Sequence, residues 1–309
     1  MLKEKRSFEN ELLNIFIGLC KGSRQFVPQD KVSKFQKLGF SVRGVEVPII
    51  VKGGRVTADM VMASKRVGNA LVVEWTKSQL TERKKHQLRK YESITGQDLR
   101  AYAFLTIRET ESVDKLVVVL QKFVSDYEAY IRQNKLPHVL LAYFYPERYR
   151  LERKFNNFVV SELNEIFDTA VEFDRIPMGF APDIDLSNMA QSGLVDEVVA
   201  ELVQLLLRRD EGEIFDLDEF VQNMLSKGFY KLLSEDKRRE ISKAVHQILK
   251  EIGKEPRFQE IFERIGTDPP KWKIKLRRSE KLKKIKALRK ALQEFADEVA
   301  GRTTFLSLF

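Results

Sequence analysis

Two acidic residues stand inside apolar stretches that are typical of buried β-strands. Asp59 directly precedes the run Met60–Ala63, and Glu74 directly follows the run Ala70–Val73. Strand positions of this kind usually carry apolar side chains, so a carboxylate at either place calls for an explanation. The pair is therefore the first candidate for a chemical site.

The segment between the two runs predicts how the carboxylates are placed. Ser64–Asn69 has the composition of a turn, and a hairpin centred between Arg66 and Val67 sets Asp59 opposite Glu74. Cross-strand neighbours have Cβ atoms about 5 Å apart. Two carboxylates that close repel each other unless a cation or a proton lies between them. Oxygen donors at this spacing suit Mg²⁺ or Mn²⁺, which also accept water and phosphate oxygens.

A helix is predicted directly after the second acidic strand, over Glu82–Ile94. Gln87 and Tyr91 are four residues apart and so lie on one face of it. An Asp on one strand, an apolar run into Glu on the next, and a helix with Q-x-x-x-Y together resemble the restriction-endonuclease-like PD-(D/E)XK nuclease superfamily. The RecB-like branch is the most similar, and the resemblance covers about Ser7 to Pro146.

The resemblance implies a metal-dependent hydrolysis of phosphodiester bonds in DNA. Asp59 and Glu74 would hold the metal, while Gln87 and Tyr91 would position the substrate phosphate. The family normally has a lysine two residues after the second carboxylate, but this sequence has Thr76 there. Three alternatives remain open: a β-bulge turns Lys77 inward, Lys84 or Lys85 of the following helix replaces the lysine, or catalysis is lost.

The remaining elements of the N-terminal half predict a mixed α/β (α+β) fold, in which a sheet is flanked by helices. Helices are expected over Ser7–Leu19, Val32–Leu38 and Val113–Gln133. Strands are expected over Val45–Val51, Arg55–Ala63, Ala70–Thr76, Ala101–Ile107 and His138–Tyr145. The charged run after Pro146 is expected to be helical, followed by a helix over Val159–Phe167 and a strand over Thr169–Ile176.

A linker is predicted at Pro177–Asn188, where Pro, Gly, Asp and Ser gather without periodicity. It would separate a nuclease domain, residues 1–180, from a mainly helical domain, residues 190–309. Four helices are expected in the second domain, over Gly193–Arg209, Asp216–Leu225, Lys231–Ile252 and Arg257–Ile265. They would form either a bundle that docks a protein partner or a helix-turn-helix unit with Trp272–Leu276 as a wing strand.

The charge of the chain favours a polyanionic partner such as DNA. The 309 residues carry a net charge of +9, and Lys271–Lys290 is the densest basic run. This run is either a phosphate-binding surface or a solvated helix face. The residues predicted to contact nucleic acid are Lys84, Lys85, Lys271, Lys273, Arg277, Arg278, Lys283 and Lys284.

The composition also narrows the class of protein. One cysteine and three scattered histidines exclude a disulfide framework and a Cys or His zinc cluster. No stretch reads as a membrane span or a signal peptide, so a cytoplasmic protein is expected. A homodimer is an open alternative, because many such nucleases cut two strands as dimers.

The leading hypothesis is a Mg²⁺- or Mn²⁺-dependent DNA endonuclease of a defence, mobile-element or repair system. The first alternative is a degenerate nuclease fold that binds DNA or acts as a scaffold without turnover, which Thr76 favours. The second alternative is an adaptor in which Asp59 and Glu74 are exposed at a sheet edge.

Overall fold

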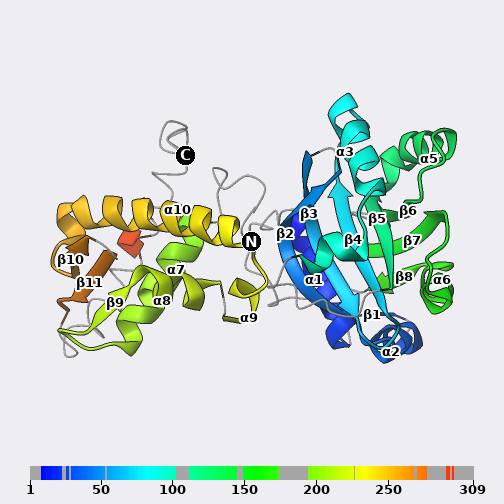
Figure 1. The fold of residues 1–309 in the computed structure, drawn as a ribbon. Coiled ribbons are helices and arrows are strands. Elements are labelled where there is room, and N and C mark those ends of the chain that lie inside the picture. Colours follow the sequence, from blue (N-terminus) through cyan, green and yellow to red (C-terminus); the bar gives the residue numbers. More distant parts are fainter. Residues whose placement is uncertain are drawn as a thin grey trace. The chain divides into compact units, whose positions relative to one another are not determined.

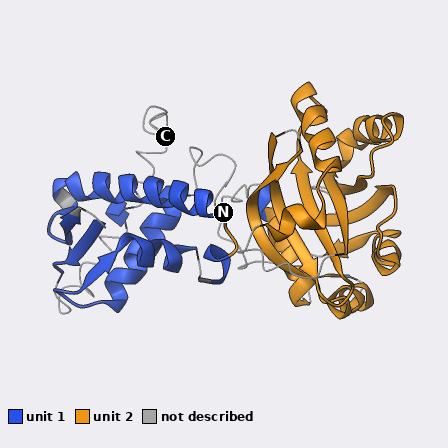
Figure 2. Cartoon of the chain, viewed as in Figure 1, with its two compact units in different colours: residues 1–10, 181–231, 235–309 blue, residues 11–180, 232–234 orange. Residues whose placement is uncertain are grey.

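The computed structural model describes residues 8–22, 26–27, 29–52, 54–101, 111–144, 149–173, 194–225, 227–267, 270–276, 290–292 and 294–295. The chain divides into two units, shown in Figure 2. The first, called the sheet unit, comprises residues 11–180 and 232–234. The second, called the C-terminal unit, comprises residues 1–10, 181–231 and 235–309. The predicted linker Pro177–Asn188 lies outside the described residues.

The sheet unit is built on a mixed sheet of eight strands in the order β1-β8-β7-β6-β5-β4-β3-β2, with helices on its faces (Figure 1). The mixed α/β fold expected from the sequence is thus confirmed. Strands β2 to β4 form an antiparallel meander, β4 to β6 run parallel, and β6 to β8 run antiparallel. The strands are β1 Phe26–Val27, β2 Ser41–Val51, β3 Gly54–Ser64, β4 Asn69–Thr76, β5 Ser112–Leu120, β6 Val139–Phe144, β7 Tyr149–Phe155 and β8 Val171–Phe173.

The predicted hairpin and its register are confirmed. β3 pairs with β4 from Ser64 opposite Asn69 to Met60 opposite Val73. One step further along this register, Asp59 stands opposite Glu74. The register is fixed because β4 is buried along its whole length, and a shift by one residue would turn every side chain to the other face.

The predicted helix over Val113–Gln133 is wrong in its first half. Residues 112–120 form β5, which pairs in parallel with both β4 and β6, and only α5 Val124–Gln133 is helical. β5 contains the run Val117–Val119, whose side chains are buried. β-branched residues pack well on such a central strand, and a strand covered on both faces reads as a continuous apolar run rather than an alternating one.

The charged run after Pro146 is also not helical. Tyr149–Phe155 forms β7, in which Leu151 is buried while Arg150 and Glu152 are only partly so. The expected helix that follows it is confirmed as α6 Ser161–Phe167, and the expected strand as β8, while residues 174–176 of its predicted range lie outside the described residues. Of the strand expected over Ala101–Ile107, residues 102–107 lie outside the described part of the chain.

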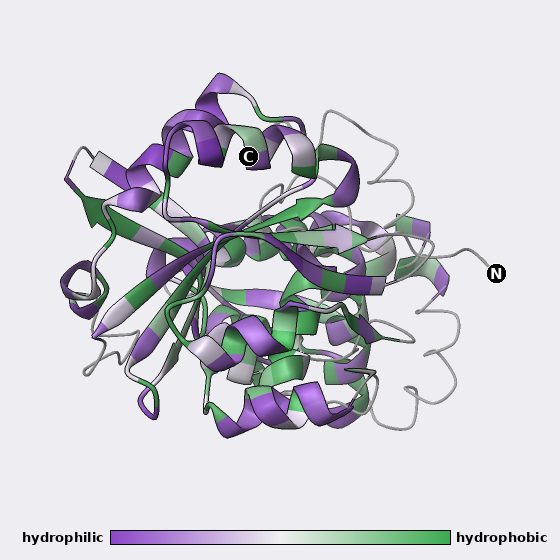
Figure 3. Cartoon of the chain, turned by 90° about the vertical axis from the view of Figure 1, so that its right-hand side faces the viewer, coloured by the Kyte–Doolittle hydropathy of each residue, from purple (hydrophilic) through white to green (hydrophobic). Residues whose placement is uncertain are grey.

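Three helices predicted beside the sheet are present as α1 Phe8–Lys21, α2 Gln29–Lys37 and α3 Glu82–Glu92. The short α4 Gly96–Arg100 was not predicted. Thr81 caps the N-terminus of α3, because its side chain accepts a hydrogen bond from the backbone N–H of Lys84 at 3.3 Å. α3 buries Tyr91 among apolar residues of β2, β3 and β4, and Leu88 among those of β5, β6 and α5. Helices that bury one side carry both hydrophilic and hydrophobic residues, as Figure 3 shows.

The C-terminal unit is mainly helical, as expected, and adds a small sheet. Its helices are α7 Leu194–Arg208, α8 Leu217–Met224, α9 Lys227–Tyr230 and α10 Glu235–Lys254. Its strands are β9 Ile214–Asp216, β10 Phe262–Thr267 and β11 Pro270–Ile274, in the order β10-β11-β9. The helix expected over Arg257–Ile265 is wrong: it is replaced by a 3-10 turn, Pro256–Phe258, and β10. None of the described helices is long and apolar enough to cross a membrane.

Candidate active site

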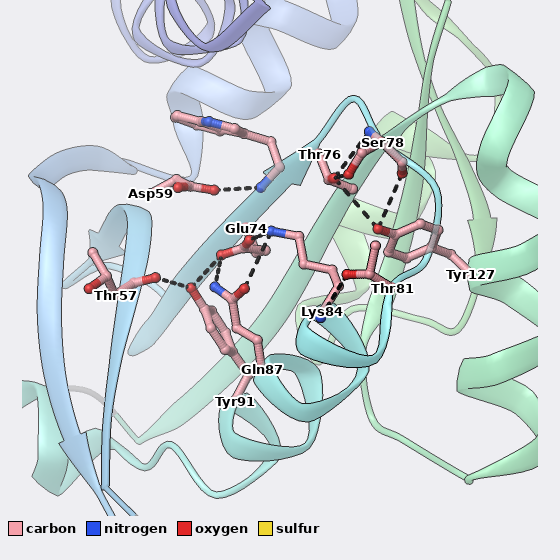
Figure 4. A network of polar contacts seen from close by, with 11 residues as sticks. Thr57, Asp59, Glu74, Thr76, Ser78, Thr81, Lys84, Gln87, Tyr91 and Tyr127 are labelled. Carbon is pink, nitrogen blue, oxygen red and sulfur yellow. Dashed lines mark hydrogen bonds and ion pairs between the residues drawn. The ribbon is translucent and has the colours of Figure 1, made fainter. Parts of the chain in front are cut away.

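Glu74 is the centre of a polar network on β4. It is 1% exposed, and both of its carboxylate oxygens have partners. Oε1 forms an ion pair with Lys84 Nζ. Oε2 accepts a hydrogen bond from Gln87 Nε2 at 2.9 Å and lies 2.6 Å from the hydroxyl oxygen of Tyr91. All three partners come from α3 and point toward the carboxylate (Figure 4).

The spacing of the three partners explains why one helix can supply them. Lys84, Gln87 and Tyr91 stand at positions i, i+3 and i+7, so they follow one face of α3. The hydroxyl of Tyr91 also lies 2.5 Å from the carbonyl oxygen of Thr57 on β3. Because a phenol has a single hydrogen, it can donate to only one of these two acceptors at a time. Tyr91 therefore connects α3 by a hydrogen bond to one strand of the acidic hairpin at a time, with an acceptor within reach on each strand.

Asp59 occupies the place where regular pairing between β3 and β4 ends. Its Oδ2 accepts a hydrogen bond from the backbone N–H of Trp75 at 2.7 Å. Burial, followed by the charges of Glu74 and Glu46, holds the pKa of Asp59 well above its usual range, although Lys84 and the Trp75 N–H act in the opposite direction. Asp59 thus lies in a buried position beside other acids, where its charged form is disfavoured.

Glu46 is a residue that the sequence reasoning missed. The register pairs Val45 with Met60 and Val47 with Ala58, which puts Glu46 across from Asp59 on β2. Its φ of 52° lies in the left-handed region although β2 continues past it, and non-glycine residues rarely adopt this conformation. The sequence feature that singled out Asp59 is also present at Glu46, because Glu46 is an acidic residue between Val45 and Val47 in a predicted strand.

Lys84 supplies the cation that the paired carboxylates require. Besides its ion pair with Glu74, its Nζ lies 3.4 Å from Gln87 Oε1. Burial alone would lower the pKa of Lys84, but the charges of Glu74 and Asp59 outweigh it and the pKa is raised. Lys84 is therefore an ammonium ion at neutral pH, held against the carboxylate by hydrogen bonds.

The other predicted lysines of this region do not join the network. Lys77 is exposed and follows the end of β4. The pairing of β4 with β5 continues without a register shift to Thr76, so the bulge that would turn Lys77 inward is not seen. Lys85 forms an ion pair with Glu82 at 2.7 Å and lies over the ring of Tyr130. Of the alternatives for the missing lysine, only Lys84 contacts a carboxylate of the pair.

Comparison with known proteins gives the family of the sheet unit. A model of the MJECL32 domain matches residues 8–181, which is more than half of the chain. The chain belongs to the MJECL32 domain family. No curated protein and no solved structure matches the sequence. The matched range contains the whole Glu74 network and ends before the described helices of the C-terminal unit, so the MJECL32 domain carries the candidate site.

The two carboxylates of the MJECL32 domain are donors of the type that hard divalent cations prefer, and both oxygens of Glu74 have protein partners in this structure. Within the described ranges, no three or more His, Cys, Asp or Glu side chains are grouped closely enough to hold a metal ion. Asp59 and Glu74 offer carboxylate oxygens alone, the donors that Mg²⁺ prefers. Mg²⁺ commonly binds through one or two carboxylates and completes its shell with water and substrate phosphate. The pair suits such an ion better than it suits zinc.

The predicted DNA-contacting residues beyond the MJECL32 domain are only partly described. Lys271 is exposed and Lys273 is half-buried on β11. The remaining predicted contacts, Arg277, Arg278, Lys283 and Lys284, lie outside the residues that the structure describes.

Proposed function

We propose that the MJECL32 domain of this chain is a metal-dependent endonuclease that hydrolyses phosphodiester bonds in DNA. The observation that carries the proposal is the buried carboxylate Glu74, which holds Lys84, Gln87 and Tyr91 beside a second carboxylate, Asp59. Burying a carboxylate and an ammonium removes both from water, and an apolar pair of similar volume is often at least as stable. Stability alone therefore does not account for this arrangement.

The resemblance to PD-(D/E)XK nucleases supports the same reading. In that family the carboxylates lie on neighbouring strands and the Q-x-x-x-Y helix follows them. Here Asp59 is on β3, Glu74 is on β4, and α3 supplies Gln87 and Tyr91. The proposal includes membership of this chain in the PD-(D/E)XK nuclease superfamily. A nuclease that cuts cellular DNA would act in the cytoplasm.

Each residue has a distinct task in the proposed reaction. A Mg²⁺ or Mn²⁺ ion held by Asp59 and Glu74 would neutralise charge on the phosphoryl and leaving oxygens. Gln87 and Tyr91 fix the orientation of Glu74 through hydrogen bonds. Lys84 keeps an ammonium group beside the carboxylates, where it would donate a hydrogen bond to a substrate phosphate oxygen and stabilise its negative charge. In this scheme Lys84 replaces the lysine that is absent at Thr76.

A second candidate function is DNA binding without cleavage. The observation that favours it is the ion pair itself, because the ammonium of Lys84 already neutralises Glu74. In that case the network would be a structural joint between α3 and the hairpin, and the chain would bind DNA without any need for a metal.

A cleavage assay separates the two functions. Supercoiled, linear duplex and single-stranded DNA would be incubated with Mg²⁺, Mn²⁺ or EDTA and with the parent protein or Glu74→Gln. Glu82→Gln is the matched control, because Glu82 is an exposed acid on α3. The nuclease proposal expects metal-dependent cutting by the parent and by Glu82→Gln but not by Glu74→Gln. Bound but uncut DNA under every condition would establish the second function instead.

A further inference from the structure

The exposed face of α10 carries a stripe of basic residues. The buried side of this helix consists of Ile241, Ala244, Val245, Ile248, Leu249 and Ile252. On the opposite side, at successive spacings of four, four, three and four residues, stand Arg239, Lys243, Gln247, Lys250 and Lys254. These spacings keep the five side chains on one helix face.

Charge is segregated within the C-terminal unit. α10, residues 235–254, contains six Lys or Arg and four acidic residues, whereas residues 210–219 contain six acidic residues and no Lys or Arg. Arg239 pairs with Glu235 at 2.5 Å and Lys254 pairs with Glu251 at 2.7 Å. Exposed pairs of this kind contribute little free energy, so a phosphate can replace the carboxylates. The unit therefore presents α10 as its basic side.

A hollow beside α10 brings further cations to the same side. It has a volume of about 420 Å³ and lies between the second half of α10 and the hairpin of β10 and β11. Lys250 and Lys254 line it from the helix, Arg264 lines it from β10 and Lys275 from the residue after β11, with Glu263 as the one carboxylate of its lining. Four cations around one concave surface favour an anionic ligand.

The order of elements matches a known way of presenting a helix to DNA. α8 and α10 are separated by the short α9, the hairpin β10–β11 follows α10, and its strand β11 pairs with β9. In helix-turn-helix proteins the second helix enters the major groove. The topology alone does not establish binding. The basic stripe on the corresponding helix is an independent observation that agrees with it.

We propose that the C-terminal unit binds duplex DNA, with α10 in the major groove and the cations of the hollow on the backbone phosphates. Duplex is favoured over single-stranded DNA because sequence-independent single-strand binding uses exposed aromatic rings as stacking platforms. Phe215, Phe262 and Trp272 are at most 2% exposed. The half-buried ring of Tyr230 is covered by Arg238, and its hydroxyl donates to Asp218. The proposal goes beyond the nuclease function, because binding at α10 needs neither a metal nor the Glu74 network.

The test compares two triple variants that lose the same charge. Lys243→Gln/Lys250→Gln/Lys254→Gln removes three cations from the stripe. The control Lys34→Gln/Lys37→Gln/Lys122→Gln removes three exposed cations of the sheet unit. Binding of the full chain to a fluorescent duplex two helical turns long would be measured by anisotropy in EDTA, over a range of salt concentrations. The same experiment would be run with one strand alone.

The stripe variant is expected to raise the Kd for the duplex by about 10-fold or more and to reduce the salt slope by about 2 to 3, since each lost phosphate contact removes about 0.9. The control variant and the parent should bind alike, and circular dichroism melting should not distinguish the three proteins. Equal losses in both variants, no loss in either, or tighter binding of the single strand would overturn the proposal. Because EDTA removes divalent metal ions, this experiment measures binding without cleavage, and its result does not depend on that of the cleavage assay.

Discussion

The charged groups of the Glu74 network are buried or partly buried, whereas those of the α10 stripe are exposed to solvent. Glu74 is buried and bound on both oxygens by residues of a single helix. Lys243 and Lys250 of the stripe are exposed. Electrostatic interactions are strong and strictly directional when water is excluded, but weak and screened by salt at a surface. The first region is therefore expected to respond to the change of a single atom, and the second to the number of charges and to salt.

The largest expected effect is a separation of cleavage from binding. Asp59→Asn and Glu74→Gln keep the shape of each side chain but remove a negative charge. Cleavage should fall by about 10³-fold or more, because charge stabilisation at the phosphoryl group is lost. The affinity for duplex DNA in EDTA should stay within a factor of about 2, since the stripe is unchanged. Anisotropy and plasmid nicking measured on the same preparations check both statements. An equal loss of binding and cleavage would contradict the assignment of cleavage to the Glu74 network and of DNA binding to the α10 stripe.

Lys84→Met tests whether the ammonium of Lys84 stabilises the buried carboxylate of Glu74 or behaves like that of an exposed lysine. The variant leaves a carboxylate with 2% side-chain exposure without its cation, so the free energy of unfolding should fall by about 3 kcal/mol. Cleavage should fall about 10²-fold. Lys85→Met is the matched control, because Lys85 pairs with an exposed acid, and its stability should change by less than about 1 kcal/mol. Urea denaturation of both variants provides the comparison. Equal stabilities would show that Lys84 behaves as a surface residue.

The raised pKa of Asp59 gives a pH-dependent prediction. A carboxyl group whose pKa is higher in the folded protein binds protons more tightly there, so the folded state loses stability as the pH rises from the ordinary Asp pKa toward the raised one. Asp59→Asn should therefore be more stable than the parent at neutral pH. The difference should shrink as the pH falls to the ordinary value of about 3.9. Denaturation curves at several pH values measure this, and a constant difference would contradict the assigned pKa direction.

Glu46→Gln is expected to have the smallest effect. Removing this charge should lower the pKa of Asp59, because Glu46 is one of the charges that raise it. Cleavage at neutral pH should change by less than about 10-fold, with its acidic limb moved to lower pH. The pH profile of cleavage provides the readout. An effect as large as that of Asp59→Asn would assign Glu46 to the metal-holding set rather than to its surroundings.

The hairpin and the α3 face were predictable because each depends on local sequence. Asp59 and Glu74 interrupt apolar runs, and a short turn fixes their register. The spacing of Gln87 and Tyr91 similarly requires only that the segment be helical. These features need no knowledge of distant contacts, and the structure has both of them.

Other features were not predictable because tertiary contacts decide them. Val113–Leu120 has apolar residues at spacings that also suit a helix, and only its place between β4 and β6 makes it a strand. In β7, Leu151 is fully buried, but the charged residues around it gave the run the appearance of a surface helix. The choice of Lys84 over Lys77 depends on how α3 packs on the sheet, which residue spacing does not reveal.

Binding of Mn²⁺ by the protein without DNA tests the central claim most directly. Electron paramagnetic resonance would follow free Mn²⁺ during titration of the parent, Asp59→Asn and the control Glu82→Gln. The parent and Glu82→Gln should take up Mn²⁺ that Mg²⁺ displaces, while Asp59→Asn should not, because it lacks one of the two carboxylates that hold the ion. Identical titrations for all three proteins would contradict the assignment of Asp59 and Glu74 as a metal site and leave the network as a joint between β3, β4 and α3.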